Sequence, residues 1–198
     1  MLKKISLTIL IPLIFSFALT ACSDDDAKYA ETTLSVAKRG KVTERIVENF
    51  DKDYYNLEEL KGEFTESIQK YNDSIGAEEI RLKNIELKDS RIYVDLDFNG
   101  PSDYERFVGE KLFVGSISDA YDNGYSMDVT LKGTEKGDKI GKVQIMGMSN
   151  DSIIILSEHV RIKTFRDIAY VSANVDLIDS DEARVLSESD GLAYLILK

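Results

Sequence analysis

The 198-residue sequence contains one cysteine, one histidine, two prolines and no tryptophan. A single cysteine excludes an intramolecular disulfide, a four-cysteine zinc site and a CxxC redox pair within the chain. A single histidine leaves no second imidazole for a histidine-based zinc site. Basic residues are outnumbered by acidic ones, 25 to 36, and the formal charge is -11. We therefore expect no nucleic-acid partner, because such proteins need a basic surface to displace counterions from phosphate.

The sequence also lacks the common catalytic and cofactor-binding motifs. There is no GxSxG elbow, no Walker loop and no GxGxxG fingerprint. Nucleophilic catalysis through histidine would have to use His159, which lies in or beside an expected strand. The acidic segments 119–124 and 176–182 lack the alternating spacing and terminal glutamate of a twelve-residue calcium loop. We expect no catalytic residue, no metal site and no cofactor.

Residues 1–21 have the composition of a secretory signal peptide. Lys3 and Lys4 precede the apolar segment 5–19, and small residues follow it. As a helix this segment would span roughly 22 Å, which is less than the ~30 Å core of a bilayer. We therefore expect removal of residues 1–21 by cleavage between Ala21 and Cys22.

The segment Leu19-Thr20-Ala21-Cys22 resembles the lipobox of bacterial lipoproteins. In such proteins the cysteine sulfur receives a diacylglyceryl group, so the resemblance implies that Cys22 carries a membrane anchor. Residues 22–31 are acidic and without periodicity, and we interpret them as a flexible tether. Loss of both signal lysines leaves 23 basic and 36 acidic residues, a charge of -13. Attachment to an anionic membrane must then come from lipid rather than from a basic patch.

Residues 32–98 predict a ββαββ unit, in which one long helix packs on a four-stranded sheet. Apolar and polar residues alternate on both sides of Gly40, which is the pattern of a β-hairpin. Apolar residues then recur at helical spacing after Asn56, a good N-cap. The strand at 92–98 alternates strictly, as in an antiparallel sheet with one buried face. The expected elements are a hairpin at 32–48, a helix at 56–72 and strands at 80–87 and 92–98.

Beyond residue 98 the sequence predicts two short helices followed by a β-rich region, giving an antiparallel, β-rich α+β fold. The first helix opens at Pro101, with Ser102 and Glu105 as a capping box; the second covers 118–122. The polar loop at 133–138 is the candidate boundary between two regions that pack together, 32–132 and 138–198. The expected strands are 127–131, 143–148, 152–156, 160–165, 168–177 and 192–197.

The segments Phe50–Tyr55, Tyr71-Asn72, Phe113-Val114-Gly115 and Gly124-Tyr125 resemble uncharacterised lipoproteins of clostridial Gram-positive bacteria. The resemblance covers roughly residues 22–131. It implies a location on the outer leaflet of the cell membrane, and it implies no activity. We therefore expect a lipid-anchored extracytoplasmic binding or scaffold module, whose partner is an envelope protein, a polymer or a small solute.

Two pairs of residues are further candidates for the surface of such a module. Asp95 and Asp97 lie on the solvated face of one strand about 7 Å apart, a spacing that a glycosidase could use. A carboxylate-type hydrolase of cell-wall glycan is therefore the alternative function. Tyr54 and Tyr55 could stack on sugars or on partner side chains. Solvated charges and rings at the edge of the core are the simpler interpretation of both pairs.

Overall fold

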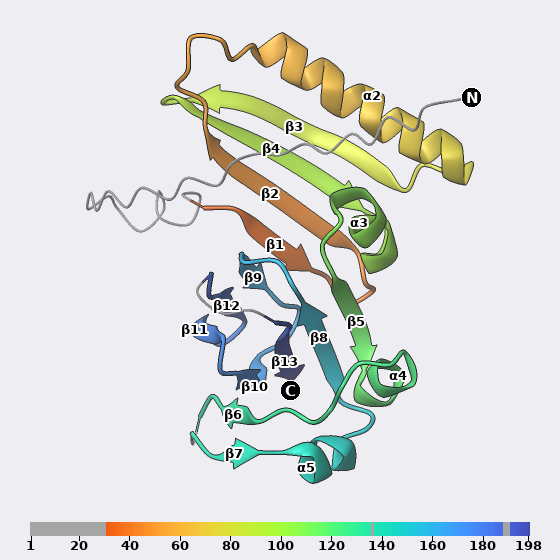
Figure 1. Ribbon diagram of the computed structural model, residues 1–198, viewed down its shortest axis with the longest axis vertical. Coiled ribbons are helices and arrows are strands. Elements are labelled where there is room, and N and C mark those ends of the chain that lie inside the picture. The colour runs from red at the N-terminus through yellow and green to blue at the C-terminus, as the bar shows by residue number, and fades with distance from the viewer. Residues whose placement is uncertain (1–30, 136, 188–190) are drawn as a thin grey trace.

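The computed structural model describes residues 31–135, 137–187 and 191–198. The predicted signal peptide, its cleavage site at Ala21 and the predicted lipidation site Cys22 lie outside the described residues. Within them, thirteen strands and four helices form two mainly antiparallel sheets (Figure 1). This confirms the expected antiparallel, β-rich α+β fold class.

The first sheet, called sheet A, contains the predicted ββαββ unit. Its strand order is β11-β12-β9-β1-β2-β4-β3, and every pairing is antiparallel except that of β1 with β9. The ββαββ unit consists of β1 (Thr33–Val36), β2 (Val42–Asn49), α2 (Leu57–Ile75), β3 (Ile80–Lys88) and β4 (Arg91–Phe98). The remaining strands are β9 (Arg161–Lys163), β11 (Val175–Asp179) and β12 (Glu182–Val185).

Helix α2 begins directly after the predicted N-cap Asn56 and extends three residues beyond the predicted end at 72. The side chain of Asn56 accepts hydrogen bonds from the backbone amides of Glu58 and Glu59, at 3.0 and 3.3 Å. Gly76 ends the helix with φ +73°, a left-handed conformation that favours glycine. Ile68 is buried, and the other apolar residues of its stripe pack against the same core. The helix lies along the β3 side of sheet A in Figure 1.

The second sheet, called sheet B, has the strand order β5-β8-β13-β10-β6-β7. Its strands are β5 (Leu112–Ser116), β6 (Leu131–Gly133), β7 (Lys139–Ile140), β8 (Ser152–Leu156), β10 (Ile168–Ser172) and β13 (Ala193–Leu197). Three short helices accompany it: α3 (Pro101–Val108), α4 (Ile117–Asp122) and α5 (Lys142–Gly147). Strand β8 reads Ser-Ile-Ile-Ile-Leu and is buried on both faces, which explains its lack of alternation.

The two faces of sheet B belong to different apolar cores. On one face Ile154 and Leu156 join the core that also contains the inner face of sheet A. On the other face Ile153 and Ile155 pack with residues of α4 and α5. Sheet B is therefore the middle layer, and it holds the ββαββ unit and the C-terminal region in one connected structure.

Three of the predicted elements differ from the structure. Residues 143–147 of the strand predicted at 143–148 belong to α5, and Met148 is its C-cap. Only Ile145 of that helix is buried, while Val143 is 84% exposed, so the apolar alternation did not reflect a buried face. The strand predicted at 127–131 is wrong except at Leu131, where β6 begins. The strand predicted at 168–177 is two strands, because a turn at 173–174 carries the chain from sheet B to sheet A.

The structure also differs from two more detailed predictions, on the capping of α3 and on the boundary at 133–138. Helix α3 is present, but Gly100 is its N-cap and the predicted capping box is wrong: the Glu105 carboxylate instead accepts the Leu112 amide at 3.0 Å. The candidate boundary at 133–138 lies in the connection between β6 and β7, and both sheets contain strands from either side of it. Among the described residues, no helix combines the length and apolarity needed to cross a bilayer.

Candidate binding groove

A groove of about 680 Å³ opens where α3, β5, the segment after α4 and β13 meet. Pro101, Ser102 and Glu105 line it from α3, and Leu192 and Tyr194 from the last strand and the residues before it. The remaining lining residues are Lys111, Leu112, Phe113, Val114, Asn123, Gly124, Tyr125 and Ser126. Its volume falls within the range of about 300–1,000 Å³ that is typical of small-ligand sites.

Aromatic rings form the apolar part of the groove. The rings of Phe113 and Tyr125 are inclined at 50° with centroids 5.1 Å apart. Gly124 has φ +86°, so the chain turns sharply before Tyr125. Burial, and then the charge of Glu105, raises the pKa of the Tyr125 hydroxyl above its ordinary value of 10.0. This hydroxyl is protonated at neutral pH, as is usual for tyrosine, and can donate a hydrogen bond.

Polar side chains also line the groove. The Glu105 carboxylate accepts the Leu112 amide and lies 3.9 Å from the Lys111 ammonium. Lys111 is largely exposed, so much of its donor capacity faces solvent. Aromatic faces beside a carboxylate, an ammonium and hydroxyl groups suit a ligand that has both apolar faces and hydroxyl or amide groups.

Strand β5, which contributes lining residues to the groove, is one of the two edge strands of sheet B. In the register of β5 on β8, the backbone N–H and C=O groups of Leu112 and Ser116 are directed away from β8. Both of these amides are already bonded: Leu112 to the Glu105 carboxylate, and Ser116 to Asp119 at 3.3 Å. Val114 lies between them with its backbone also directed outward, so these carboxylates occupy only part of the edge.

A buried acidic cluster lies beside the groove, on the inner side of α3. Glu44 of β2 is 3% exposed, and one of its carboxylate oxygens has no hydrogen-bond partner among the described residues. Burial, with the nearby Glu158 carboxylate as the second cause, raises the pKa of Glu44 to about 8. The Tyr104 hydroxyl donates a hydrogen bond to Glu158, whose pKa burial also raises. Glu44 and Tyr104 are buried in the core, whereas Glu158 is partly exposed.

The alternation of the hairpin contains a signal for Glu44. Val42 and Ile46 have the spacing of one strand face, and a period of two places Glu44 between them on that face. The groove has no comparable signal in local periodicity, although Phe113, Val114, Gly124 and Tyr125 belong to segments that carry the resemblance described above. Its lining residues come from segments between 101 and 194, which only the tertiary structure brings together.

The structure places Asp95 and Asp97 on the solvated face of sheet A, each with its own cross-strand partner. Asp95 forms a bidentate pair with Arg45, at 2.6 and 2.8 Å. Asp97 accepts the Thr43 hydroxyl at 2.7 Å and lies 3.7 Å from the Lys83 ammonium. Both aspartates therefore bond to side chains of neighbouring strands, and this structural role accounts for their presence on β4.

We expect Asp95→Asn to destabilise the fold by about 1 kcal/mol, because it weakens a bidentate, partly buried ion pair. Urea unfolding of Asp95→Asn, Arg45→Gln and the double variant would measure the coupling between the two side chains. Asp97→Asn serves as the comparison, since the Lys83 ammonium is farther from its carboxylate and more exposed. Additive effects of the two single substitutions would contradict a stabilising pair.

The other sequence candidates lie apart from the groove. Tyr54 and Tyr55 are in the loop between β2 and α2, and His159 is exposed between β8 and β9. The acidic segment 119–124 falls largely in α4, and 176–182 largely in the β11–β12 hairpin. No group of three or more potential metal-ligating side chains occurs among the residues that the structure describes.

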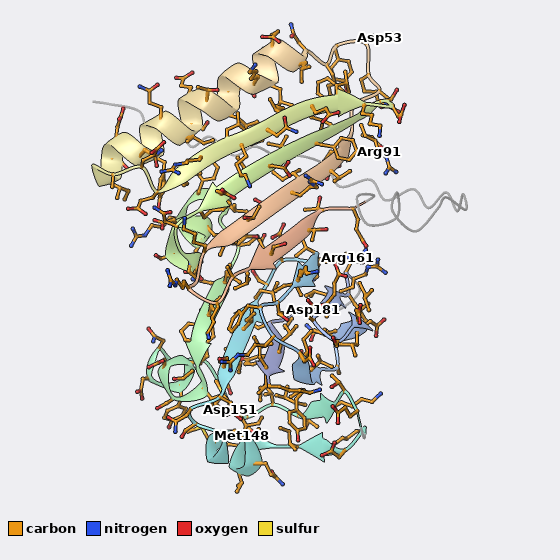
Figure 2. All side chains as sticks on the ribbon, turned by 180° about the vertical axis from the view of Figure 1, so that it is seen from behind. Asp53, Arg91, Met148, Asp151, Arg161 and Asp181 are labelled. Atoms are coloured by element: carbon orange, nitrogen blue, oxygen red, sulfur yellow. The ribbon has the colours of Figure 1, made fainter. Side chains whose placement is uncertain are left out.

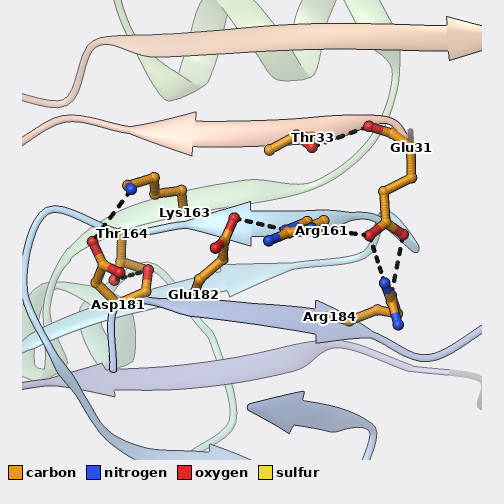
Figure 3. A network of polar contacts seen from close by, with 8 residues as sticks. All are labelled: Glu31, Thr33, Arg161, Lys163, Thr164, Asp181, Glu182 and Arg184. Atoms are coloured by element: carbon orange, nitrogen blue, oxygen red, sulfur yellow. Dashed lines mark hydrogen bonds and ion pairs between the residues drawn. The ribbon is translucent and has the colours of Figure 1, made fainter. Parts of the chain in front are cut away.

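A network of polar contacts holds Glu31, the first described residue, against sheet A (Figure 3). Arg161 of β9 binds Glu182 of β12 through Nε at 2.7 Å, and both side chains are largely buried. The Glu31 carboxylate accepts from Arg184 at 2.5 Å and lies 3.5 Å from Arg161. Residue 31 is thus held against β9 and β12, which defines where the preceding segment joins the domain.

Comparison with protein-family models, with curated proteins and with solved structures finds no match for this chain.

Proposed function

We propose that this protein is an extracytoplasmic lipoprotein, anchored through Cys22, whose folded domain binds a small solute or a short segment of an envelope polymer in the groove. The anchor rests on the sequence of residues 1–22. The observation that supports binding is the groove itself, where Phe113 and Tyr125 face a mixed set of polar groups. Its size favours a compact ligand.

A photo-cross-linking residue at position 125 tests this proposal. In cells that export the protein, p-benzoylphenylalanine in place of Tyr125 should capture the occupant of the groove on irradiation, and mass spectrometry would identify the adduct. The matched control is the same residue at Tyr121, which is 50% exposed on the adjacent α4 but does not line the groove. Equal capture at both positions, or capture at neither, would contradict a binding groove.

Lys111→Ala provides an independent test of the same groove. Because the Lys111 ammonium is the exposed cation of the lining, its loss should lower capture at position 125 several-fold for a ligand that accepts hydrogen bonds, as about 1 kcal/mol per lost bond implies. Lys142→Ala, an exposed lysine of α5 outside the groove, should leave capture unchanged.

The alternative, a carboxylate-type hydrolase of wall glycan, would need Asp95 and Asp97 to act together. Their separate partners, Arg45 and Thr43, give that arrangement no support. Purified protein should accordingly leave wall glycan intact. Release of soluble fragments that disappears in the Asp95→Asn, Asp97→Asn double variant would replace the binding proposal by the enzymatic one.

A further inference from the structure

An aromatic tip projects from sheet A at the end where the N-terminal segment joins the domain. We define the tip as residues 50–55 and 87–91, the loop after β2 together with the β3–β4 turn. The Phe50 amide bonds the Ser90 carbonyl at 2.7 Å, which ties the two segments together. Asp53 and Arg91, labelled in Figure 2, mark this end of the molecule.

Strand register shows that the tip lies beyond the start of β1. Thr33, near the beginning of the described chain, is opposite Arg45 of β2. Strand β2 continues to Asn49, which is opposite Arg91 beside the β3–β4 turn. These four further residues of β2 extend about 13 Å at ~3.3 Å per residue. The tip therefore extends about 13 Å beyond Thr33 along the strand direction.

The tip exposes apolar side chains that the fold leaves uncovered. Tyr54 is 78% exposed, and Tyr55 and Leu87 are exposed by 41% and 44%. Tyr55 stacks on Phe50 at 4.8 Å, and Tyr54 meets Tyr55 edge to face at 4.9 Å. Tyrosine clusters of this kind, with an apolar ring and a polar hydroxyl, suit the interface between membrane and water.

The tip is also neutral in a strongly acidic chain. Its three aspartates are balanced by Lys52, Lys88 and Arg91, whereas the chain from residue 22 onward carries -13. Much of the remaining surface would be repelled by anionic headgroups, but the tip would not. The outward face of α2, for comparison, is predominantly acidic.

We infer that the tip rests in the headgroup region of the membrane to which Cys22 is attached, so that the lipid anchor and the tyrosines together orient the domain. The inference rests on the anchor of the proposed function. Cys22 and Glu31 are nine positions apart, a separation of at most about 30 Å, which exceeds the ~13 Å by which the tip extends beyond Thr33. Tip contact is therefore within reach of the anchored chain. With the tip at the membrane, α5 at the opposite end in Figure 1 faces away from it.

The absence of tryptophan from the sequence makes a direct test available. The full lipidated protein carrying Tyr54→Trp would be reconstituted in vesicles of phosphatidylcholine and phosphatidylglycerol with brominated acyl chains. We expect its emission to shift to shorter wavelength and to lose most of its intensity relative to unbrominated vesicles. Leu87→Trp, at the same tip, should respond likewise. Val143→Trp on α5 is the matched control and should keep its intensity.

Vesicle flotation separates failure of this inference from failure of the proposed anchor. Protein that floats with the vesicles while both tip tryptophans keep full emission would overturn the inference and leave the anchor intact. Equal quenching at position 143 would also overturn it, because the domain would then have no preferred orientation. Protein that does not float would overturn the anchor and, with it, membrane contact of the tip.

Discussion

Cys22→Ser is expected to abolish lipid incorporation and to release the protein from membranes. The predicted modification needs a thiol as its nucleophile, and Cys22 is the single cysteine of the chain. Each buried methylene contributes about 0.8 kcal/mol to membrane binding, and two acyl chains are needed for stable attachment. Because the remaining chain carries -13, electrostatic attraction to an anionic surface cannot replace the lipid.

Labelled palmitate and membrane fractionation would measure this effect. Label should enter the wild type and Ser23→Ala, which alters the neighbouring residue and keeps the thiol, but should not enter Cys22→Ser. The released variant should keep the circular dichroism of the wild type, since Cys22 precedes the described domain. Label in Cys22→Ser, or a native chain that still begins at Met1, would refute the anchor.

Glu44→Gln is expected to stabilise the fold at alkaline pH, on the order of 3–5 kcal/mol at pH 8. The pKa of Glu44 is about 8 in the folded protein, mainly because of burial, against an ordinary value of 4.5. Between these values the folded state holds a proton that the unfolded state has lost. Wild-type stability therefore falls as pH rises from about 4.5 to about 8, and this contribution is fully lost above pH 8. Glutamine cannot ionise, so the stability of Glu44→Gln should not show this part of the decrease between pH 4.5 and pH 8.

Urea unfolding at a series of pH values would measure the difference. The two proteins should have similar stability near pH 4.5 and diverge steadily toward pH 8. Glu86→Gln, a glutamate exposed on β3, removes one charge without removing a buried carboxylate and should follow the wild-type profile. Parallel profiles for Glu44→Gln and wild type would show that Glu44 does not ionise on unfolding. Glu158 adds to the decline in the same direction, since its pKa is also raised by burial.

Local sequence patterns predicted the N-terminal half of the fold better than the C-terminal half. In β4 strict alternation of buried and solvated residues coincides with the observed faces, and α2 has both its caps in the sequence. These elements are long and amphipathic, so each one carries its own signal. Strands β5 and β12 are short and were not predicted, and α5 has a single buried residue. Their conformations depend on partners that local patterns do not reveal.

The sequence by itself led to the proposed destination of this protein, because the predicted signal peptide and the lipobox-like segment are short linear patterns. It also determined the ββαββ unit through its periodicities. Only the tertiary structure decided the parallel pairing of β1 with β9, the groove around Phe113 and Tyr125, and the burial of Glu44 beside Glu158. Each of these joins residues separated by many positions in the chain. Their contacts follow from how the two sheets pack, which short-range patterns do not encode.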